Sequence, residues 1–140
     1  MIRLNRETDY SFRVVLCLAR AGDTVRLPTS QIQKEMHIPP SFLHRIVASL
    51  GHSHIIHTFP GREGGVQLAR PASEISLLDV YEAVEGPLQL SQCFSEECDC
   101  PLEVLCPVQK SLRHIQKAIA REFSSIHFDQ FDPQTGLLLP

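Results

Sequence analysis

The feature that most constrains the fold of this chain is a pair of short helical patterns separated by the turn His37-Ile38-Pro39-Pro40. Ahead of the turn, Ser30-x-x-Gln33 matches a capping box, and Ile32 and Met36 follow at helical spacing. The first proline stops this helix, because the residue before a proline disfavours the helical conformation. Beyond the turn an apolar stripe recurs at i, i+3, i+4 and i+7, formed by Leu43, Ile46, Val47 and Leu50. The pattern predicts a helix over 30–36 and a second one led by Pro40 and Ser41, which together make a helix-turn-helix.

The flanking segments predict the rest of a winged helix-turn-helix domain over residues 1–86. A buried helix is expected over 7–20, where Phe12, Val15, Leu16 and Ala19 share one face. Two strands, within 54–59 and 66–69, flank the glycine-rich hairpin tip 60–65. Ser76 is expected to cap a helix that ends at Gly86, with the stripe Leu77, Val80, Tyr81 and Val84. The predicted fold is mainly α with a small β-wing.

Charge separates the two halves of the chain. Residues 1–70 hold nine basic and five acidic residues, whereas residues 71–140 hold four basic and eleven acidic ones, so the net charge of -3 averages two unlike halves. The basic half is a candidate for binding a polyanion. No apolar run approaches the ~18 residues of a membrane span, and the first residues lack a signal-peptide pattern. We therefore expect a cytoplasmic protein, in which clustered cysteines indicate metal or redox chemistry.

The helix-turn-helix predicts a DNA-binding surface, because its second helix enters the major groove with its N-terminal residues at the base edges. That end offers Ser41, His44 and Arg45, and Arg45 suits bidentate bonding to guanine. At the hairpin tip Arg62 lies among glycines, including Gly64 and Gly65, that allow close approach to DNA. Further DNA contacts are assigned to Arg3, Arg6, Ser30 and Lys34. The alternative is a purely structural three-helix core.

Four cysteines fall within fourteen residues of the segment 87–106, in the spacing Cys93-x4-Cys98-x-Cys100-x5-Cys106. Thiolates are soft ligands that suit an iron–sulfur cluster or zinc. Binding of both Cys98 and Cys100 to one small ion would be strained, and the spacing differs from that of common zinc sites. A labile cluster with three thiol ligands is favoured, and a disulfide switch is a further option. The fifth cysteine, Cys17, is expected to be a core side chain.

A long helix is expected from Pro107 to about Phe123, within a unit spanning 107–125. Its apolar stripe consists of Val108, Leu112, Ile115, Ile119 and Phe123. Residues 126–140 are expected to form a C-terminal tail, and partial disorder is expected from residue 124 onward because the periodicity there is weak.

Four stretches resemble the Rrf-type family of winged-helix regulators, which includes the IscR and NsrR proteins. They are Leu4-x-x-x-Thr8-Asp9-Tyr10-Ser11-Phe12-Arg13, Ile38-Pro39-Pro40-Ser41-Phe42-Leu43, Gly61-Arg62-x-Gly64-Gly65-Val66-x-Leu68 and Pro71-Ala72-x-x-Ile75-x-x-x-Asp79-Val80. The resemblance covers about residues 1–123. It implies a homodimer joined by the long C-terminal helix and a near-palindromic operator in double-stranded DNA. It also implies an iron–sulfur cluster, 4Fe-4S or 2Fe-2S, that controls DNA affinity.

The resemblance implies three cysteine ligands for this cluster. Cys93 and Cys106 fit the outer two, while Cys98 and Cys100 remain alternatives for the middle one, because each fits a different interval of the family. Gln109 stands where IscR-like members carry a histidine ligand. The candidate fourth ligand is Asp9 of the partner subunit, as in some NsrR-like members. The alternative role of Asp9 is that of a first-turn carboxylate favoured by the helix dipole.

Together these patterns predict a DNA-binding transcriptional regulator, expected to act as a repressor, that senses nitric oxide, redox state or iron through the cluster. The alternative keeps the fold but replaces the cluster with a zinc site or a thiol–disulfide switch. An enzyme is not expected, because the sequence shows no general base or oxyanion loop beside the cysteines.

Overall fold

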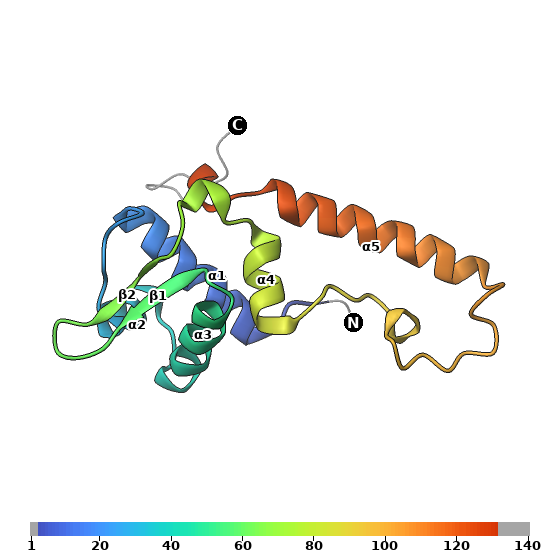
Figure 1. Ribbon diagram of the computed structural model, residues 1–140, viewed down its shortest axis with the longest axis horizontal. Helices are drawn as coiled ribbons and strands as arrows, with labels where there is room; N and C mark the ends of the chain where they lie inside the picture. The colour runs from blue at the N-terminus through green and yellow to red at the C-terminus, as the bar shows by residue number, and fades with distance from the viewer. Residues whose placement is uncertain (1–2, 132–140) are drawn as a thin grey trace.

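Residues 3–131 are described by the computed structural model, and Figure 1 shows their path. In chain order the elements are α1 (Arg6–Ala21), α2 (Thr29–Met36), α3 (Pro40–His52), β1 (Ile56–Phe59), β2 (Gly65–Leu68), the 3-10 helix η1 (Ala72–Glu74), α4 (Leu77–Glu85), η2 (Gln92–Phe94), α5 (Pro107–Ser125) and η3 (Phe128–Gln130). The expected mainly α fold with a small β-wing is confirmed. Across the described residues no helix is long and apolar enough to cross a membrane.

Local sequence builds the turn between α2 and α3. His37 ends α2 in the left-handed conformation, with a φ of 51°, and its N–H donates to the carbonyl of Gln33. Ile38 then turns into the core, and Pro40 occupies the first turn of α3, where a missing N–H costs nothing. Only the three residues 37–39 therefore separate the two helices.

The predicted capping box at Ser30 is wrong. The helix begins one residue earlier, at Thr29, and follows Pro28, which makes no side-chain cap bond. The reason lies outside the helix, because Leu27 exchanges two backbone hydrogen bonds of 2.9 Å with Val66 of β2. This bridge holds the chain extended up to Pro28 and so fixes the point at which α2 starts.

The two strands of the wing pair antiparallel, with Ile56 opposite Leu68 and Phe59 opposite Gly65. Ile56, Val66 and Leu68 are buried, so one side of the wing belongs to the core. The first strand starts at Ile56 rather than at residue 54, because His54 adopts a left-handed φ of 56° in the turn that leaves α3. The second strand is shifted by one residue as well, since β2 runs from Gly65 to Leu68 instead of over 66–69, and the hairpin itself matches the prediction.

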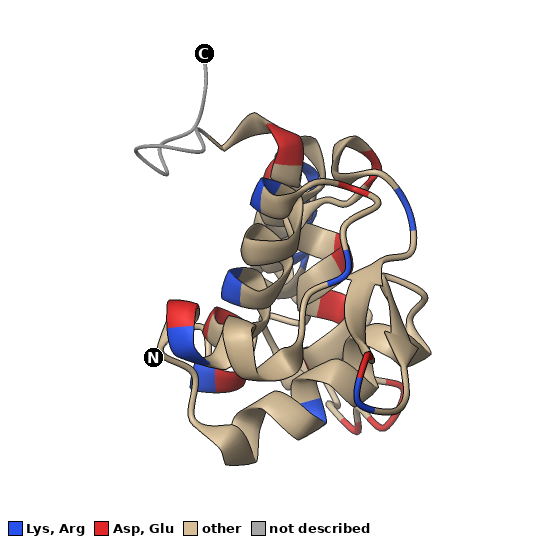
Figure 2. Cartoon of the chain, turned by 90° about the vertical axis from the view of Figure 1, so that its left-hand side faces the viewer, with Lys and Arg blue, Asp and Glu red and all other residues tan. Residues whose placement is uncertain are grey.

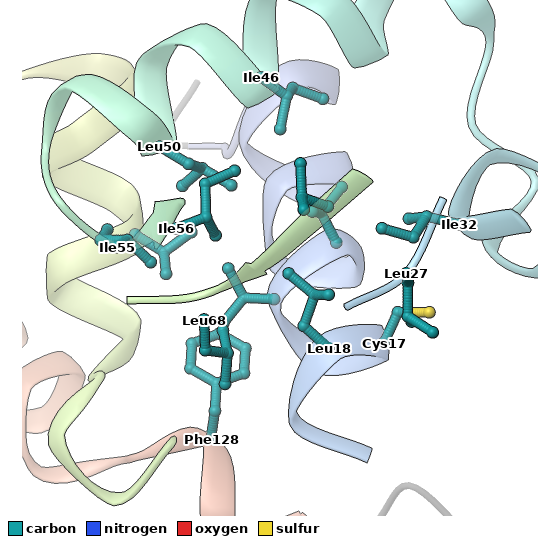
Figure 3. Close-up of a cluster of buried hydrophobic side chains, with 14 of the residues drawn as sticks. Cys17, Leu18, Leu27, Ile32, Ile46, Leu50, Ile55, Ile56, Leu68 and Phe128 are labelled. Atoms are coloured by element: carbon teal, nitrogen blue, oxygen red, sulfur yellow. The ribbon is translucent and has the colours of Figure 1, made fainter. Parts of the chain in front are cut away.

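One apolar core joins the helices to the wing (Figure 3). Leu18 of α1 and Ile46 and Leu50 of α3 are fully buried in it, next to Ile56 and Leu68 of the wing. Cys17 lies in the same cluster and is 4% exposed, which confirms it as a core side chain.

Part of the expected C-terminal tail is ordered against this core. The N–H of Phe128 donates to the carbonyl of Ile75, and the N–H of Leu77 donates to the carbonyl of Ile126. The ring of Phe128 is buried, with its centroid 6.5 Å from that of Phe12. The hydrogen-bond partners of this segment lie some fifty residues earlier in the chain, so no local sequence pattern predicts the contact. Residues 132–140 of the predicted tail lie outside the described residues.

Helix α5 begins far from the wing and returns to the body of the molecule (Figure 1). Its C-terminal part packs on α4, where the rings of Phe123 and Tyr81 meet edge to face at 6.1 Å. Its N-terminal half projects beyond α1–α4 together with the cysteine-bearing segment. The fold thus places the helix-turn-helix and the cysteines at opposite ends.

Candidate nucleic-acid interface and cysteine loop

The exposed face of α3 carries three of the predicted DNA-binding residues. Leu43, Ile46 and Leu50 are buried, so the helical repeat turns Ser41, His44 and Arg45 outward, and all three are exposed. They share the N-terminal half of the helix, as a recognition helix requires. The structure therefore brings these side chains onto one surface.

Arg45 is engaged within the protein. Its guanidinium forms an ion pair of 3.2 Å with Glu7 of α1 and lies 5.2 Å from the centroid of the Phe42 ring. The Arg45 side chain nevertheless stays 61% exposed. The pair orients the guanidinium along the face of α3 while leaving it accessible.

Gly64 and Gly65 are required by the wing itself. A Cβ on Gly64 would collide with the backbone carbonyl of Phe59, and one on Gly65 would collide with that of Leu27. Gly65 also has a φ of 148°, a conformation that side chains rarely adopt. These glycines let three backbone segments pack closely, and Arg62 is left exposed at the tip.

Arg26 is a wing residue that the sequence analysis missed. Its guanidinium lies 3.5 Å from the centroid of the Phe59 ring, and Nη1 donates to the carbonyl of Glu63. Arg26 precedes α2 by three positions and is remote from the wing in sequence. Its nearest sequence signal is the aromatic Phe59 at the end of a predicted strand, which gives no indication of the partner.

A groove of about 770 Å³ runs between α3 and β1, beside the predicted DNA-binding face. Four histidines line it, namely His44, His52, His54 and His57. Imidazoles both donate and accept hydrogen bonds, so this groove extends the polar surface of α3 toward the wing.

Two other predicted DNA-binding residues, Arg3 and Ser30, lie outside α3. Arg3 lines a groove of about 610 Å³ together with Tyr81 of α4 and Phe123 of α5. Ser30 is exposed in the first turn of α2. Basic and acidic segments are interspersed over the side of the molecule shown in Figure 2.

The four clustered cysteines line two neighbouring cavities. Cys93, Cys98 and Cys100 contribute to a cavity of about 510 Å³. Cys93, Cys100 and Cys106 contribute to a second one of about 190 Å³, beside the first turn of α5. Cys100 is exposed and the other three are half-buried. Cys93 and Cys100 are therefore common to both cavities.

Cys106 is the N-cap of α5, and its sulfur accepts a hydrogen bond from the N–H of Gln109 at 3.4 Å. This bond fixes the Cys106 sulfur at the first turn of α5. Burial raises the pKa of the Cys98 thiol above its ordinary value, and the nearby Glu103 adds to this shift, whereas the N–H of Cys100 opposes it. The thiols thus differ in their surroundings.

The three thiols around each cavity are candidate ligands of a metal centre by donor type. Across residues 3–131, no three His, Cys, Asp or Glu side chains converge closely enough to hold one metal ion. An iron–sulfur cluster distributes its cysteine ligands over several irons, so its thiolates stand apart around a shared space. Three thiols around one cavity fit this requirement in donor type and in number.

Within one chain, the side chains of Asp9 and Gln109 are engaged in contacts other than metal binding at the cysteine cavities. The Asp9 carboxylate pairs with Arg13 at 2.7 Å and lines neither cysteine cavity. Gln109 is buried, and its Nε2 donates to the carbonyl of Cys93. Cys17 is remote from the loop, and burial raises the pKa of its thiol to about 11.

Comparison with known proteins identifies the chain. The family model Rrf2, described as an iron-dependent transcriptional regulator, matches residues 4–131. The chain belongs to the Rrf2 family. Members of this family are transcriptional regulators, so this Rrf2 protein is a DNA-binding regulator and not an enzyme.

Individual relatives agree with this assignment. Protein aau3 of Rhizobium meliloti is 33% identical, over 99% of this chain and 92% of its own. The transcriptional regulator NsrR of Halalkalibacterium halodurans is 31% identical, over 86% of this chain and 83% of its own. Among solved structures, CymR, the global cysteine regulator of B. subtilis, matches with a TM-score of 0.73 at 18% identity, over 92% of this chain and 95% of its own. The last likeness supports the winged-helix fold.

Proposed function

We propose that this Rrf2 regulator holds an iron–sulfur cluster through Cys93, Cys100 and Cys106. The observation that carries the proposal is the cavity of about 190 Å³ that these three thiols share at the start of α5. Cys98 lines the other cavity, so we assign the middle position to Cys100 and regard Cys98 as a spare thiol. The NsrR relatives and the iron-dependent family support the same type of site.

When bound, such a cluster supplies a centre that responds to nitric oxide, redox state or iron. The protein contributes the connection to the DNA-binding residues. The segment 87–106 joins the end of α4 to the start of α5, so its conformation acts on both helices. Asp9 of the partner subunit remains our candidate for the fourth ligand, released from Arg13 when it binds.

Single cysteine substitutions test the ligand set. We expect anaerobically purified protein to be brown and to contain iron and sulfide. Cys98→Ser should keep the visible absorbance of the wild type, whereas Cys100→Ser should lose most of it, because only the second change removes a ligand. The measurement is the visible spectrum with iron and sulfide analysis. Loss of the cluster in Cys98→Ser and its retention in Cys100→Ser would reverse our assignment.

The exposed stripe of α5 supports a dimer. Val108 is 62% and Ile115 is 47% exposed, although both belong to the apolar stripe of the helix. A second copy of the same helix is a self-complementary partner for such a face, and a two-fold dimer presents two copies of α3 to a near-palindromic operator. We therefore assign 107–125 to dimerisation and 1–86 to DNA binding, with 126–131 packed on the latter.

Disruption of this stripe tests the dimer. Ile115→Glu should give a monomer and weaken operator binding on the order of 100-fold, because the two half-sites are no longer engaged together. Light scattering gives the mass and fluorescence anisotropy gives the affinity. The matched control is Lys117→Glu, an exposed residue of the same helix, which should leave the dimer intact. A dimeric Ile115→Glu protein would contradict the assignment.

The second candidate function is a thiol–disulfide or zinc switch on the same fold. The fourth thiol favours it, since Cys93, Cys98 and Cys100 line one cavity without any need for a cluster. Under this alternative, carefully anaerobic protein is colourless, and either binds zinc or loses free thiols on oxidation. Metal analysis and thiol titration of the same sample distinguish the two candidates.

A further inference from the structure

Three side chains on one face of α5 hold the segment that carries the first cysteine. Gln109, Arg113 and Gln116 follow each other at i, i+4 and i+7. Nε2 of Gln109 donates to the carbonyl of Cys93 at 3.2 Å, and Oε1 of Gln116 accepts from the N–H of Leu90 at 2.9 Å. Between them the Arg113 guanidinium lies 4.9 Å from the centroid of the Phe94 ring.

These contacts give hydrogen-bond partners to backbone groups of the segment 87–106. Residues 87–106 contain a single 3-10 turn, so most of their backbone groups have no helix or strand to pair with. Half-buried backbone groups need hydrogen-bond partners, and a glutamine amide satisfies either a carbonyl or an N–H. Gln109 is 8% exposed, which is rare for a glutamine without a structural task.

Gln109 also reaches the last cysteine of the loop. Its side chain bonds the backbone of Cys93, while its own N–H donates to the sulfur of Cys106. One residue therefore touches both ends of the segment that bears the four thiols. Its position fixes where Cys93 stands relative to Cys106 at the first turn of α5.

We infer that Gln109, Arg113 and Gln116 form a latch that sets the position of Cys93 and couples the cysteine loop to α5. They are positioning residues, which act through the backbone of Cys93 and Leu90 and through the Phe94 ring. The inference extends the proposed function, because a change at the thiols that breaks the latch frees residues 90–94 from the helix proposed to join the dimer. The latch itself exists in the metal-free protein and is testable there.

Hydrogen exchange and thiol alkylation of reduced, metal-free protein test the latch directly. Gln116→Leu should speed exchange of the Leu90 amide by about 3- to 10-fold, since one hydrogen bond is lost. Gln109→Leu should speed alkylation of Cys93 by a similar factor, also about 3- to 10-fold. Amides of α1, such as that of Leu18, should not change, which separates a local effect from loss of overall stability. The matched control is Lys117→Leu, which puts the same residue on an exposed position of α5.

Gln109→Glu provides the second variant, because it keeps the size of the side chain but removes the donor to Cys93. It should also speed alkylation of Cys93, but less than Gln109→Leu does, because the new carboxylate disfavours the reactive thiolate. Where a cluster is present, both variants should lose visible absorbance faster than the wild type. Unchanged exchange at Leu90 and unchanged alkylation of Cys93 would overturn the latch. A wild type that holds no cluster would contradict only the proposed function, since the metal-free measurements stand apart from it.

Discussion

Arg45 is shared between an ion pair within the protein and the predicted contact with DNA. The Arg45 side chain of this pair is 61% exposed and that of Glu7 is 23% exposed, and ion pairs near the surface contribute roughly 0–1 kcal/mol. A bidentate contact to guanine contributes about 1–3 kcal/mol of discrimination. The predicted contact with DNA is therefore expected to be the stronger one, with a net gain reduced by the loss of the pair with Glu7.

Two substitutions test this balance. Arg45→Ala should weaken operator binding by about 10- to 100-fold. Glu7→Gln should strengthen it by about 2- to 5-fold, because Arg45 no longer leaves a charged partner. Fluorescence anisotropy with an operator duplex measures both, and Glu74→Gln, an exposed carboxylate of η1, is the control. Glu7→Gln should have no effect in the Arg45→Ala protein, and a gain there would refute the coupling.

At the scale of elements, the wing is held by residues outside it. Leu27 pairs with Val66, and the neighbouring Arg26 stacks on Phe59 and bonds the carbonyl of Glu63. The connection between α1 and α2 thus pairs with the hairpin along β2, as a short third strand would. This support reaches Glu63, the residue next to Arg62 at the tip.

Removal of the Arg26 contact should loosen the wing. Arg26→Gln loses the stacking on Phe59, which is worth about 0.5–1 kcal/mol at exposed sites, so operator binding should weaken by about 2- to 5-fold. The operator affinity of Arg26→Lys should fall between those of the wild type and Arg26→Gln, since an ammonium does not stack as a guanidinium does. Arg20→Gln, which removes an exposed arginine of α1, is the matched control. Equal loss in both glutamine variants would show that only the charge matters.

At the scale of the whole molecule, the segment after α5 packs back against the N-terminal half of the chain. After α5 has passed along the body, η3 inserts Phe128 between η1 and α1, where it contacts Phe12. The helix that begins beside the cysteines is therefore tied at its other end to the core of the DNA-binding half. We therefore expect a displacement of α5 to act on that core through residues 126–128.

Loss of this packing should be costly. Phe128→Ala should lower the free energy of unfolding by about 3–5 kcal/mol, because a buried ring is removed and a cavity remains. Phe131→Ala should cost less, since Phe131 is only half-buried beside Phe128. Chemical denaturation followed by circular dichroism measures both. A loss below about 1 kcal/mol for Phe128→Ala would mean that η3 contributes little to the fold.

Much of the element order was predictable because it rests on local patterns. The proline turn, the stripe of α3 and the cap at Ser76 each act within a few residues, and the structure confirms all three. The start of α2 was not predictable, because the pairing of Leu27 with Val66 decides it. The order of residues 126–131 depends likewise on partners near Ile75.

The candidate site divides in the same way. The outward positions of Ser41, His44 and Arg45 follow from the helical repeat around buried leucines, so the sequence was sufficient to group them. The sequence could not predict which thiols line which of the two cavities, because the segment 87–106 has no repeat that fixes its path. Cys98 and Cys100 are alternatives in the sequence, and our choice of Cys100 is a proposal based on the cavity that it shares with Cys93 and Cys106.

The sequence by itself determined the kind and order of the elements, the outward face of α3 and the four candidate thiols, since periodicity, capping and residue chemistry are local. Only the tertiary structure decided which distant residues meet. It placed Arg26 on Phe59, Glu7 on Arg45, Gln109 on Cys93 and Phe128 in the core. These contacts join segments far apart in the chain, and their partners are selected by the packing of the whole fold rather than by any neighbouring residue.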